Sequence, residues 1–249
     1  MGLTHQSTGL EIKREDFVPA HIVGDYTIGL AGNPNTGKST IFNALTGLNQ
    51  HTGNWPGKTV AQARGFYQYA GKNFVLMDLP GTYSLLASSP EEEIARDFLC
   101  FGRPDATIIM VDATCLERNL NLVLQVLEIT PKVVVCLNLI DEAERKGLVV
   151  DVDRLRDELG VPVVPTAANS GRGLASLKDW IYRVASNQVS CQPNLVKYPE
   201  SMEQAIRELE GELKILPISG LSERWVAIRL LENDASALAA IDQYAIASS

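Results

Sequence analysis

The sequence predicts a doubly wound α/β domain with a small all-helical domain behind it. Apolar runs rich in Val and Ile, such as TIIMVD at residues 107–112 and KVVVCLN at residues 132–138, are typical of parallel strands buried on both faces. Segments with helical spacing of apolar residues alternate with these runs. After a polar stretch at residues 187–199, only helical patterns remain.

The α/β domain is predicted to span residues 25–187. Its strands are expected at the apolar runs 26–31, 107–112, 132–138 and 161–165. Residues 64–69 and 74–78 are expected to form a hairpin around the turn AGKN. Helices are expected between the strands, at residues 39–48, 91–101, 119–127, 151–159 and 174–185. Of these, helix 91–101 is preceded by Ser89-Pro90 and has three acids in its first turn, which favours a helix N-terminus there.

The two ends of the chain are predicted to differ from this domain. Residues 1–24 are polar and unpatterned, so we expect a flexible lead. Residues 188–249 are expected to form a linker and a helical domain, with helices within 201–214, 222–234 and 235–245. In the second of these helices, Trp225, Ile228 and Leu231 are predicted to share one face.

Composition excludes several classes of protein. A net charge of −8 argues against broad nucleic-acid binding, which needs clustered Lys and Arg. Three His without ligand spacing make a zinc site unexpected, and no apolar run approaches the roughly 18 residues of a membrane span. The N-terminus lacks a signal-peptide core. We therefore expect a soluble chain whose four widely spaced cysteines are buried, reduced thiols.

The stretch GNPNTGKST at residues 32–40 predicts a phosphate-binding loop. It matches G-x-x-x-x-G-K-[ST] and lies between a predicted strand and a predicted helix. Backbone amides and the helix N-terminus would face the phosphates, Lys38 would add a charge, and the Ser39 hydroxyl could ligate magnesium. The alternative is an ordinary glycine-rich turn. The predicted nucleotide-binding residues of this loop are Gly32, Asn33, Pro34, Asn35, Thr36, Gly37, Lys38, Ser39 and Thr40.

A second motif, Asp78-Leu79-Pro80-Gly81, ends the next strand along the chain. An Asp at this place can hold magnesium through water, and the Gly81 amide can meet the γ-phosphate. Strands often end in Asp and turn at Gly, so the motif alone is a weak signal. It indicates a nucleotide site here because it ends the strand that follows a phosphate loop.

Two further motifs favour guanine as the base. Asp141, in Asn138-Leu139-Ile140-Asp141, can accept both N–H groups of the guanine edge, although N-x-x-D can also be a helix cap. We count Asn138, Leu139 and Asp141 as nucleotide-binding.

The fourth motif, Thr166-Ala167-Ala168, follows another predicted strand. Its backbone amides could meet the guanine O6. Many related proteins have Ser at the place of Ala167. Ala167 is therefore expected to lack a side-chain contact that supports this loop, while the contact from the Ala168 amide to the base remains. Together the four motifs predict a Ras-like P-loop GTPase domain.

Four longer stretches resemble the FeoB ferrous iron transporter family: NQHTGNWPGKTVAQARG at 49–65, DLPGTYSL at 78–85, DATCLERNLNLVLQVLE at 112–128, and RWVAIRLLEND at 224–234. The resemblance covers about residues 25–245. It implies a GTP-binding and GTP-hydrolysing domain on the cytoplasmic face of the bacterial inner membrane, with a GDI-like helical domain. Nucleotide-driven changes in two switch segments would regulate Fe(II) transport through a membrane domain that is absent from this chain.

The resemblance also assigns roles in the switch segments. Thr59 resembles the switch I threonine that binds magnesium and senses the γ-phosphate, and Gly57 beside it is expected to contact nucleotide. Thr82 stands where Ras-like enzymes carry Gln, so that mechanism is not available at this position. Lys58 departs from the family's usual apolar residue. Its charge could perturb switch I, but we expect it to point to solvent.

A potassium ion beside the phosphates is implied in place of the missing Gln. Its ligands would be the Asn35 side chain and the carbonyls of Gly53 and Trp55. Alternatively, Asn35 is a loop-stabilising amide and Trp55 a hydrophobic plug. Hydrolysis is therefore expected to be slow and potassium-stimulated, with catalytic roles for Asn35, Lys38, Thr59 and Gly81.

Candidate partners implied by the resemblance are GTP or GDP, the membrane-spanning domain of the same protein, a small accessory protein of the iron-uptake system, and further copies of the chain, without nucleic acid. No ferrous ligand cluster is evident in the sequence. One rival interpretation is a soluble GTPase of the Era or tRNA-modification type acting on RNA, but its expected basic module is replaced here by an acidic helical tail. Another is a regulatory nucleotide sensor, which single-turnover and nucleotide-release rates would distinguish.

Overall fold

A seven-stranded sheet organises the chain in a computed structural model that describes residues 24–47, 50–55, 58–86, 88–215 and 220–245. The strand order is β2-β3-β4-β1-β5-β6-β7. β1 pairs in parallel with β4 and β5, whereas β3 is antiparallel to both β2 and β4. The strands are β1 (Tyr26–Gly32), β2 (Gln50–Asn54), β3 (Ala61–Tyr69), β4 (Lys72–Asp78), β5 (Ala106–Asp112), β6 (Val133–Asn138) and β7 (Val163–Pro165).

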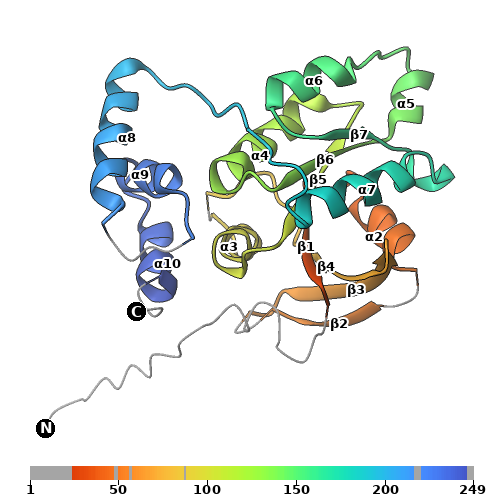
Figure 1. Cartoon of the computed structure of the whole chain (residues 1–249), viewed down its shortest axis with the longest axis horizontal. Coiled ribbons are helices and arrows are strands. Elements are labelled where there is room, and N and C mark those ends of the chain that lie inside the picture. The colour runs from red at the N-terminus through yellow and green to blue at the C-terminus, as the bar shows by residue number, and fades with distance from the viewer. Residues whose placement is uncertain (1–23, 48–49, 56–57, 87, 216–219, 246–249) are drawn as a thin grey trace, which may run out of the picture.

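Helices cover both faces of this sheet, as Figure 1 shows. Because successive side chains of a strand point to opposite faces, Ile108 and Met110 of β5 pack in one apolar cluster, and Ile109 and Val111 pack in another. The helices of this domain are α2 (Lys38–Thr46), α3 (Pro90–Asp97), the π-helical turn η1 (Phe98–Gly102), α4 (Leu116–Ile129), α5 (Ile140–Arg145), α6 (Val152–Leu159), the 3₁₀ turn η2 (Ala168–Ser170) and α7 (Leu174–Ala185).

The C-terminal helices form a separate group beside α3 and α4 (Figure 1). Ile206, Trp225 and Ala237 are buried in the same apolar cluster as Val126 of α4. The group is therefore joined to the α/β domain through one face of the sheet. Its helices are α8 (Glu200–Leu213), α9 (Glu223–Leu231) and α10 (Ala235–Ala245).

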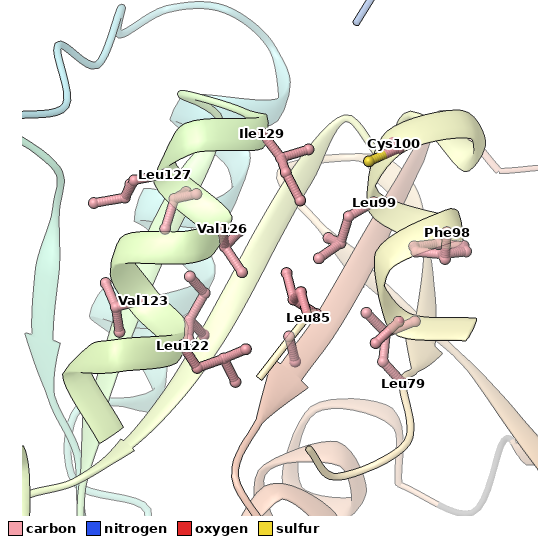
Figure 2. Close-up of a cluster of buried hydrophobic side chains, with 14 of the residues drawn as sticks. Leu79, Leu85, Phe98, Leu99, Cys100, Leu122, Val123, Val126, Leu127 and Ile129 are labelled. Carbon is pink, nitrogen blue, oxygen red and sulfur yellow. The ribbon is translucent and has the colours of Figure 1, made fainter. Parts of the chain in front are cut away.

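The contact between the sheet helices is apolar and close. Figure 2 shows Leu85 between α4 and η1, with Leu122 and Val126 on one side and Leu99 on the other. Leu85 is only 5% exposed, although it lies in the loop that follows β4. The segment after Asp78 is thus anchored to α4.

The predicted fold class is confirmed, with differences in detail. β2 and α5 were not expected: every residue of β2 is exposed, so no apolar alternation marks it, and only pairing with β3 makes it a strand. The helix expected at 91–101 ends in a π-helical turn after Asp97. The Ser89 side chain accepts the Glu92 N–H at 3.2 Å, as the cap signal suggests. The predicted lead, apart from residue 24, lies outside the described residues.

Two expectations about burial are wrong. Leu231 is 42% exposed, because the buried face of α9 runs through Trp225, Val226 and Ile228 instead. Cys115 is exposed, because it lies in the loop that connects β5 to α4. Of the other cysteines, Cys100 and Cys136 are buried and Cys191 is partly buried, and all four are free thiols.

Candidate nucleotide-binding site

The predicted phosphate loop connects the end of β1 to the start of α2. Asn35 and Gly37 have positive φ, 66° and 81°, so the backbone turns sharply between strand and helix. A Cβ atom on Gly37 would lie 2.3 Å from the Asn138 side-chain nitrogen. Only glycine fits at this position, because both the dihedral angle and the space exclude a side chain.

Hydrogen bonds of two buried side chains stabilise the phosphate loop. The Thr36 hydroxyl donates to the Asn33 carbonyl at 2.9 Å, and the Asn33 side chain, 2% exposed, donates to the Arg118 carbonyl at 3.2 Å. The Asn33 side chain therefore supports the turn through its amide nitrogen. Asn35 differs: it is exposed, and its side chain makes no hydrogen bond with the residues that the structure describes. The loop-stabilising alternative for Asn35 gains no support.

Asn138 joins this loop to the predicted base-binding loop. Its side-chain amide donates to the Thr36 carbonyl at 3.0 Å, and its side-chain oxygen accepts from the Thr166 hydroxyl and the Ala168 N–H, each at 3.2 Å. The residue is fully buried. Both ends of the amide are thus used within the protein, so Asn138 fixes the distance between two loops. Ala168, which was expected to meet O6, has a protein acceptor here.

Asp141 lies at the start of α5 with its side chain 41% exposed. The preceding Leu139 has a φ of 60°, which turns the chain out of β6 and into this helix. The nearest basic group is Arg145, with its guanidinium 3.7 Å from the Asp141 carboxylate. Ala167 is buried, and its N–H donates to the Arg172 carbonyl at 3.0 Å. The structure thus leaves the Asp141 carboxylate open to a base.

Lys38 and Asp78 form an ion pair at the centre of the site. The Lys38 ammonium lies 2.5 Å from the Asp78 carboxylate. Burial raises the pKa of Asp78, and the charge of Lys38 partly offsets that effect. Because the two side chains are 13% and 20% exposed, the pair is only partly screened. A phosphate group would give the ammonium a second anionic partner.

The segment after Asp78 lies against the phosphate loop. A Cβ atom on Gly81 would be 3.4 Å from Pro34, so the two backbones are close. The Thr82 N–H donates to the Gly32 carbonyl at 3.2 Å. The Thr82 side chain is 4% exposed, and its hydroxyl donates to the Ser84 carbonyl at 2.6 Å. Thr82 is therefore turned inward and cannot orient a water as Gln would.

The predicted switch I segment is anchored by one aromatic side chain. Trp55 is 2% exposed, and its ring meets Phe98 of η1 edge-on, with centroids 5.6 Å apart. Trp55 is thus a hydrophobic plug, and only one lone pair of its carbonyl oxygen is left for another ligand. That carbonyl accepts the Lys58 N–H at 3.0 Å. Gly53 is exposed in β2, and Gly57 lies outside the described residues.

Thr59 and Lys58 occupy exposed positions beside β3. The structure shows no hydrogen bond from the Thr59 hydroxyl to any part of the chain that it describes, and the residue is exposed. The side chain of Lys58 is 40% exposed and its ammonium lies 2.8 Å from the Glu93 carboxylate of α3. The expectation that Lys58 points to solvent is thus only partly right, because a salt bridge ties it to α3.

Other residues of this site were not singled out from the sequence. Arg118 supplies the carbonyl that holds Asn33, and its guanidinium lies 4.3 Å from the centre of the Tyr83 ring. Glu93 binds Lys58 across 35 residues of sequence. A backbone carbonyl carries no sequence signal, and Glu93 is one of three consecutive acids, so neither contact could be read from the sequence.

Two known protein families match this chain. The family described as ferrous iron transport protein B matches residues 26–181, and the FeoB cytosolic helical domain matches residues 198–248. The chain belongs to the ferrous iron transport protein B family. The predicted resemblance is therefore confirmed.

Relatives and solved structures of this family agree with the assignment. The Fe(2+) transporter FeoB of Shigella flexneri is 40% identical over 214 residues, which are 84% of this chain and 27% of the relative. The corresponding protein of Salmonella typhimurium is 41% identical over 213 residues, again 84% and 27%. This chain thus spans about a quarter of the length of these relatives.

Two solved structures cover most of the chain. The cytosolic domain of the T. maritima FeoB iron transporter in apo form has a TM-score of 0.80 at 38% identity, covering 88% of this chain and 86% of that one. Its GMPPNP form has a TM-score of 0.80 at 37% identity, with the same coverage. Within the residues described here, no helix is both long and apolar enough to cross a membrane.

Proposed function

We propose that this chain binds and hydrolyses GTP as the cytosolic domain of a ferrous iron uptake transporter, and that its switch segments regulate Fe(II) transport through a membrane domain. The observation that carries the proposal is the buried amide of Asn138, which joins the phosphate loop to the base-binding loop. Solved relatives are described as GDP and GMPPNP forms, which supports a guanine nucleotide as the ligand.

The phosphates would lie on the loop between Gly32 and Thr40. Its backbone amides and the N-terminus of α2 favour negative charge, and the Lys38 ammonium would move from Asp78 toward the outer phosphates. The Gly81 N–H lies on the segment that touches this loop, in position to approach the γ-phosphate. The Asp141 carboxylate would accept the N–H groups of guanine, which adenine does not present as a pair.

Magnesium fits the oxygen ligands that this site offers. The hydroxyls of Ser39 and Thr59 and the carboxylate of Asp78 are the hard ligands that this ion prefers. Ser39 is exposed at the mouth of the loop, so its hydroxyl is accessible. Thr59 would have to approach from its exposed place beside β3, which would couple switch I to the nucleotide.

Potassium fits a second set of oxygens, those of Asn35, Gly53 and Trp55. The Asn35 side chain is exposed and forms no hydrogen bond with the described residues, so its oxygen is available. The Trp55 carbonyl accepts one N–H and has a second lone pair. A cation held there would neutralise the negative charge that develops between the β- and γ-phosphates. Because Thr82 is turned inward, hydrolysis without this help is expected to be slow.

The test uses the full-length protein in sealed membrane vesicles. Fe(II) uptake is measured with GTP, with GDP and with a non-hydrolysable GTP analogue, for the unaltered protein and for Lys38→Ala. The proposal expects uptake that depends on the nucleotide and is lost in the variant. Arg154→Ala, on α6 with its side chain 77% exposed, serves as a folded control with unchanged uptake. Uptake at the same rate with every nucleotide would refute a regulatory role.

A nucleotide sensor remains the second candidate. The inward hydroxyl of Thr82 favours it, because slow hydrolysis could time a conformational change without driving transport. If GTP and its non-hydrolysable analogue support equal uptake while GDP does not, the chain acts as a sensor. A soluble relative acting on RNA is disfavoured by the net charge of −8.

A further inference from the structure

A cavity of about 350 Å³ lies between α4 and the helical domain, and none of the predicted nucleotide-binding residues lines it. Leu124, Gln125 and Glu128 of α4 form one wall, Trp225 of α9 forms the opposite wall, and Tyr198 of the linker closes one side. Pockets for small molecules usually have this size and this mixture of apolar walls and few polar groups. The cavity is therefore large enough for a small organic ligand.

Glu128 is the unusual member of this wall. It is 7% exposed, and within the described residues no hydrogen-bond donor reaches either of its carboxylate oxygens. Its nearest charge is the Arg224 guanidinium, 3.3 Å away but without hydrogen-bond geometry. Burial raises the pKa of Glu128, which reflects the cost of keeping this charge out of water.

The surrounding arginines are already committed to other carboxylates. Arg224 donates two hydrogen bonds to Glu203, at 2.8 and 2.9 Å, and one to the Val196 carbonyl at 3.0 Å. Arg229 is 3.0 Å from Glu232 and 3.6 Å from Asp234. Four carboxylates thus share two guanidinium groups, and among the described residues only Glu203 accepts hydrogen bonds from one of them. The Glu128 carboxylate thus has an ion pair with Arg224 but no hydrogen-bond donor among the described residues.

We propose that this cavity binds a small aliphatic amine in its ammonium form. The ammonium group donates hydrogen bonds to the carboxylate of Glu128, which lacks donors. The apolar stem lies along Leu124 and Trp225, which form the walls. A neutral hydroxyl head donates a single hydrogen bond without charge, and an anionic head is repelled by the carboxylate, so the charge of the head decides the binding.

The segment that follows Asp78 contributes Leu85 to the lining of the same cavity. The Leu85 N–H donates to the Gln125 side-chain oxygen at 2.7 Å, and both residues line the cavity. Leu85 belongs to the DLPGTYSL stretch that resembles switch II. An amine in this place therefore lies between α4, the helical domain and switch II.

The test titrates the whole chain with hexylammonium chloride and follows binding by calorimetry and by the fluorescence of Trp225 and its neighbours. Hexanol and hexanoate have the same stem and serve as neutral and anionic comparators. We expect saturable binding of hexylammonium, and binding of both comparators weaker by about tenfold or more. This comparison uses the unaltered chain, so it does not depend on whether a variant folds.

A matched pair of variants locates the binding. Glu128→Gln keeps the shape and removes the charge, and it is expected to weaken hexylammonium binding by about tenfold. Glu208→Gln, on the exposed side of α8, is expected to bind as the unaltered chain does. A cooperative thermal unfolding transition of Glu128→Gln shows that the variant is folded, even if loss of the ion pair with Arg224 lowers its midpoint.

Three results overturn the proposal. Equal binding of hexanol and hexylammonium would show a merely apolar cavity. Undiminished binding by Glu128→Gln would place the amine elsewhere. Tighter binding of an acetylated Leu-Lys-Leu peptide than of hexylammonium would assign the surface to a lysine of a partner protein instead of a small amine.

Discussion

The phosphate and base loops are held in a different way from switch I, although all of them lie along one side of the sheet. The two loops are joined by neutral, buried hydrogen bonds that converge on Asn138. Switch I is attached to the rest by the Trp55 ring and by the Lys58–Glu93 salt bridge, while β2 is exposed throughout. Buried polar networks rigidify the structure around them, whereas exposed pairs contribute little. The two loops are thus held by buried hydrogen bonds, and switch I by one buried ring and one partly exposed ion pair.

The largest loss of stability should follow from removing Asn138, which joins the phosphate loop to the base loop. Asn138→Ala removes three hydrogen bonds and leaves the Thr36 carbonyl, the Thr166 hydroxyl and the Ala168 N–H without their partner. We expect the free energy of unfolding to fall by about 2–4 kcal/mol, because buried polar groups become unpaired. GTP affinity should fall with it, by about a hundredfold. Chemical denaturation and nucleotide titration measure the two quantities.

Asn121→Ala is the control for this variant, because Asn121 is exposed on α4. It should change the unfolding free energy by less than about 0.5 kcal/mol. If Asn138→Ala behaved like Asn121→Ala, the buried network would not be what fixes the two loops.

The base end of the same rigid region can be tested without disturbing its supports. Asp141 is 41% exposed, so Asp141→Ala should leave stability nearly unchanged. Preference for GTP over ATP should fall by about a hundredfold, because two hydrogen bonds to a charged acceptor are lost. Competition binding with GTP and ATP gives the ratio. Selectivity that survives the substitution would mean that another group recognises guanine.

The sequence predicts the two regions unequally, because different interactions stabilise them. Gly37, Lys38 and Asp78 belong to motifs whose spacing is dictated by the phosphate, so both the loop and its place on the sheet could be derived. β2 could not, because its five exposed residues lack alternation and depend on pairing with β3. The same holds for the Trp55–Phe98 contact, which brings together residues far apart in the chain. The tertiary contacts of switch I leave few local signals in the sequence.

Asn35 belongs to the rigid loop, but its side chain forms no hydrogen bond with the described residues, so its loss should affect chemistry more than stability. The strain of Ala at a φ of 66° should cost about 1 kcal/mol. Asn35→Ala is expected to abolish the stimulation of GTP hydrolysis by potassium over sodium, an effect of about tenfold. Asn33→Ala is the contrasting variant, since Asn33 is 2% exposed and holds the loop. It should lower stability by about 1–3 kcal/mol. Phosphate-release rates in the two salts and unfolding curves separate the two asparagines. Equal rates in both salts for the unaltered chain would remove the potassium site.

The smallest effect concerns the salt bridge that ties switch I to α3. Lys58 and Glu93 have side chains 40% and 32% exposed, so their attraction is screened by solvent and should contribute no more than about 1 kcal/mol. A double-mutant cycle of Lys58→Ala and Glu93→Ala, run by denaturation at low and at high salt, measures this interaction. We expect a small coupling that shrinks as salt rises.

The comparison between the two regions makes this weak coupling informative. A contact that holds a moving segment must be easily broken, and Thr59 beside Lys58 has to leave its exposed position if it is to reach the nucleotide. Breaking the pair should therefore lower the cost of that movement and raise GTP affinity by up to about fivefold, the factor that corresponds to 1 kcal/mol. GDP affinity should stay unchanged, because GDP lacks the γ-phosphate that Thr59 would sense. A coupling of several kcal/mol, independent of salt, would show instead that switch I is as firmly built as the loops held by Asn138.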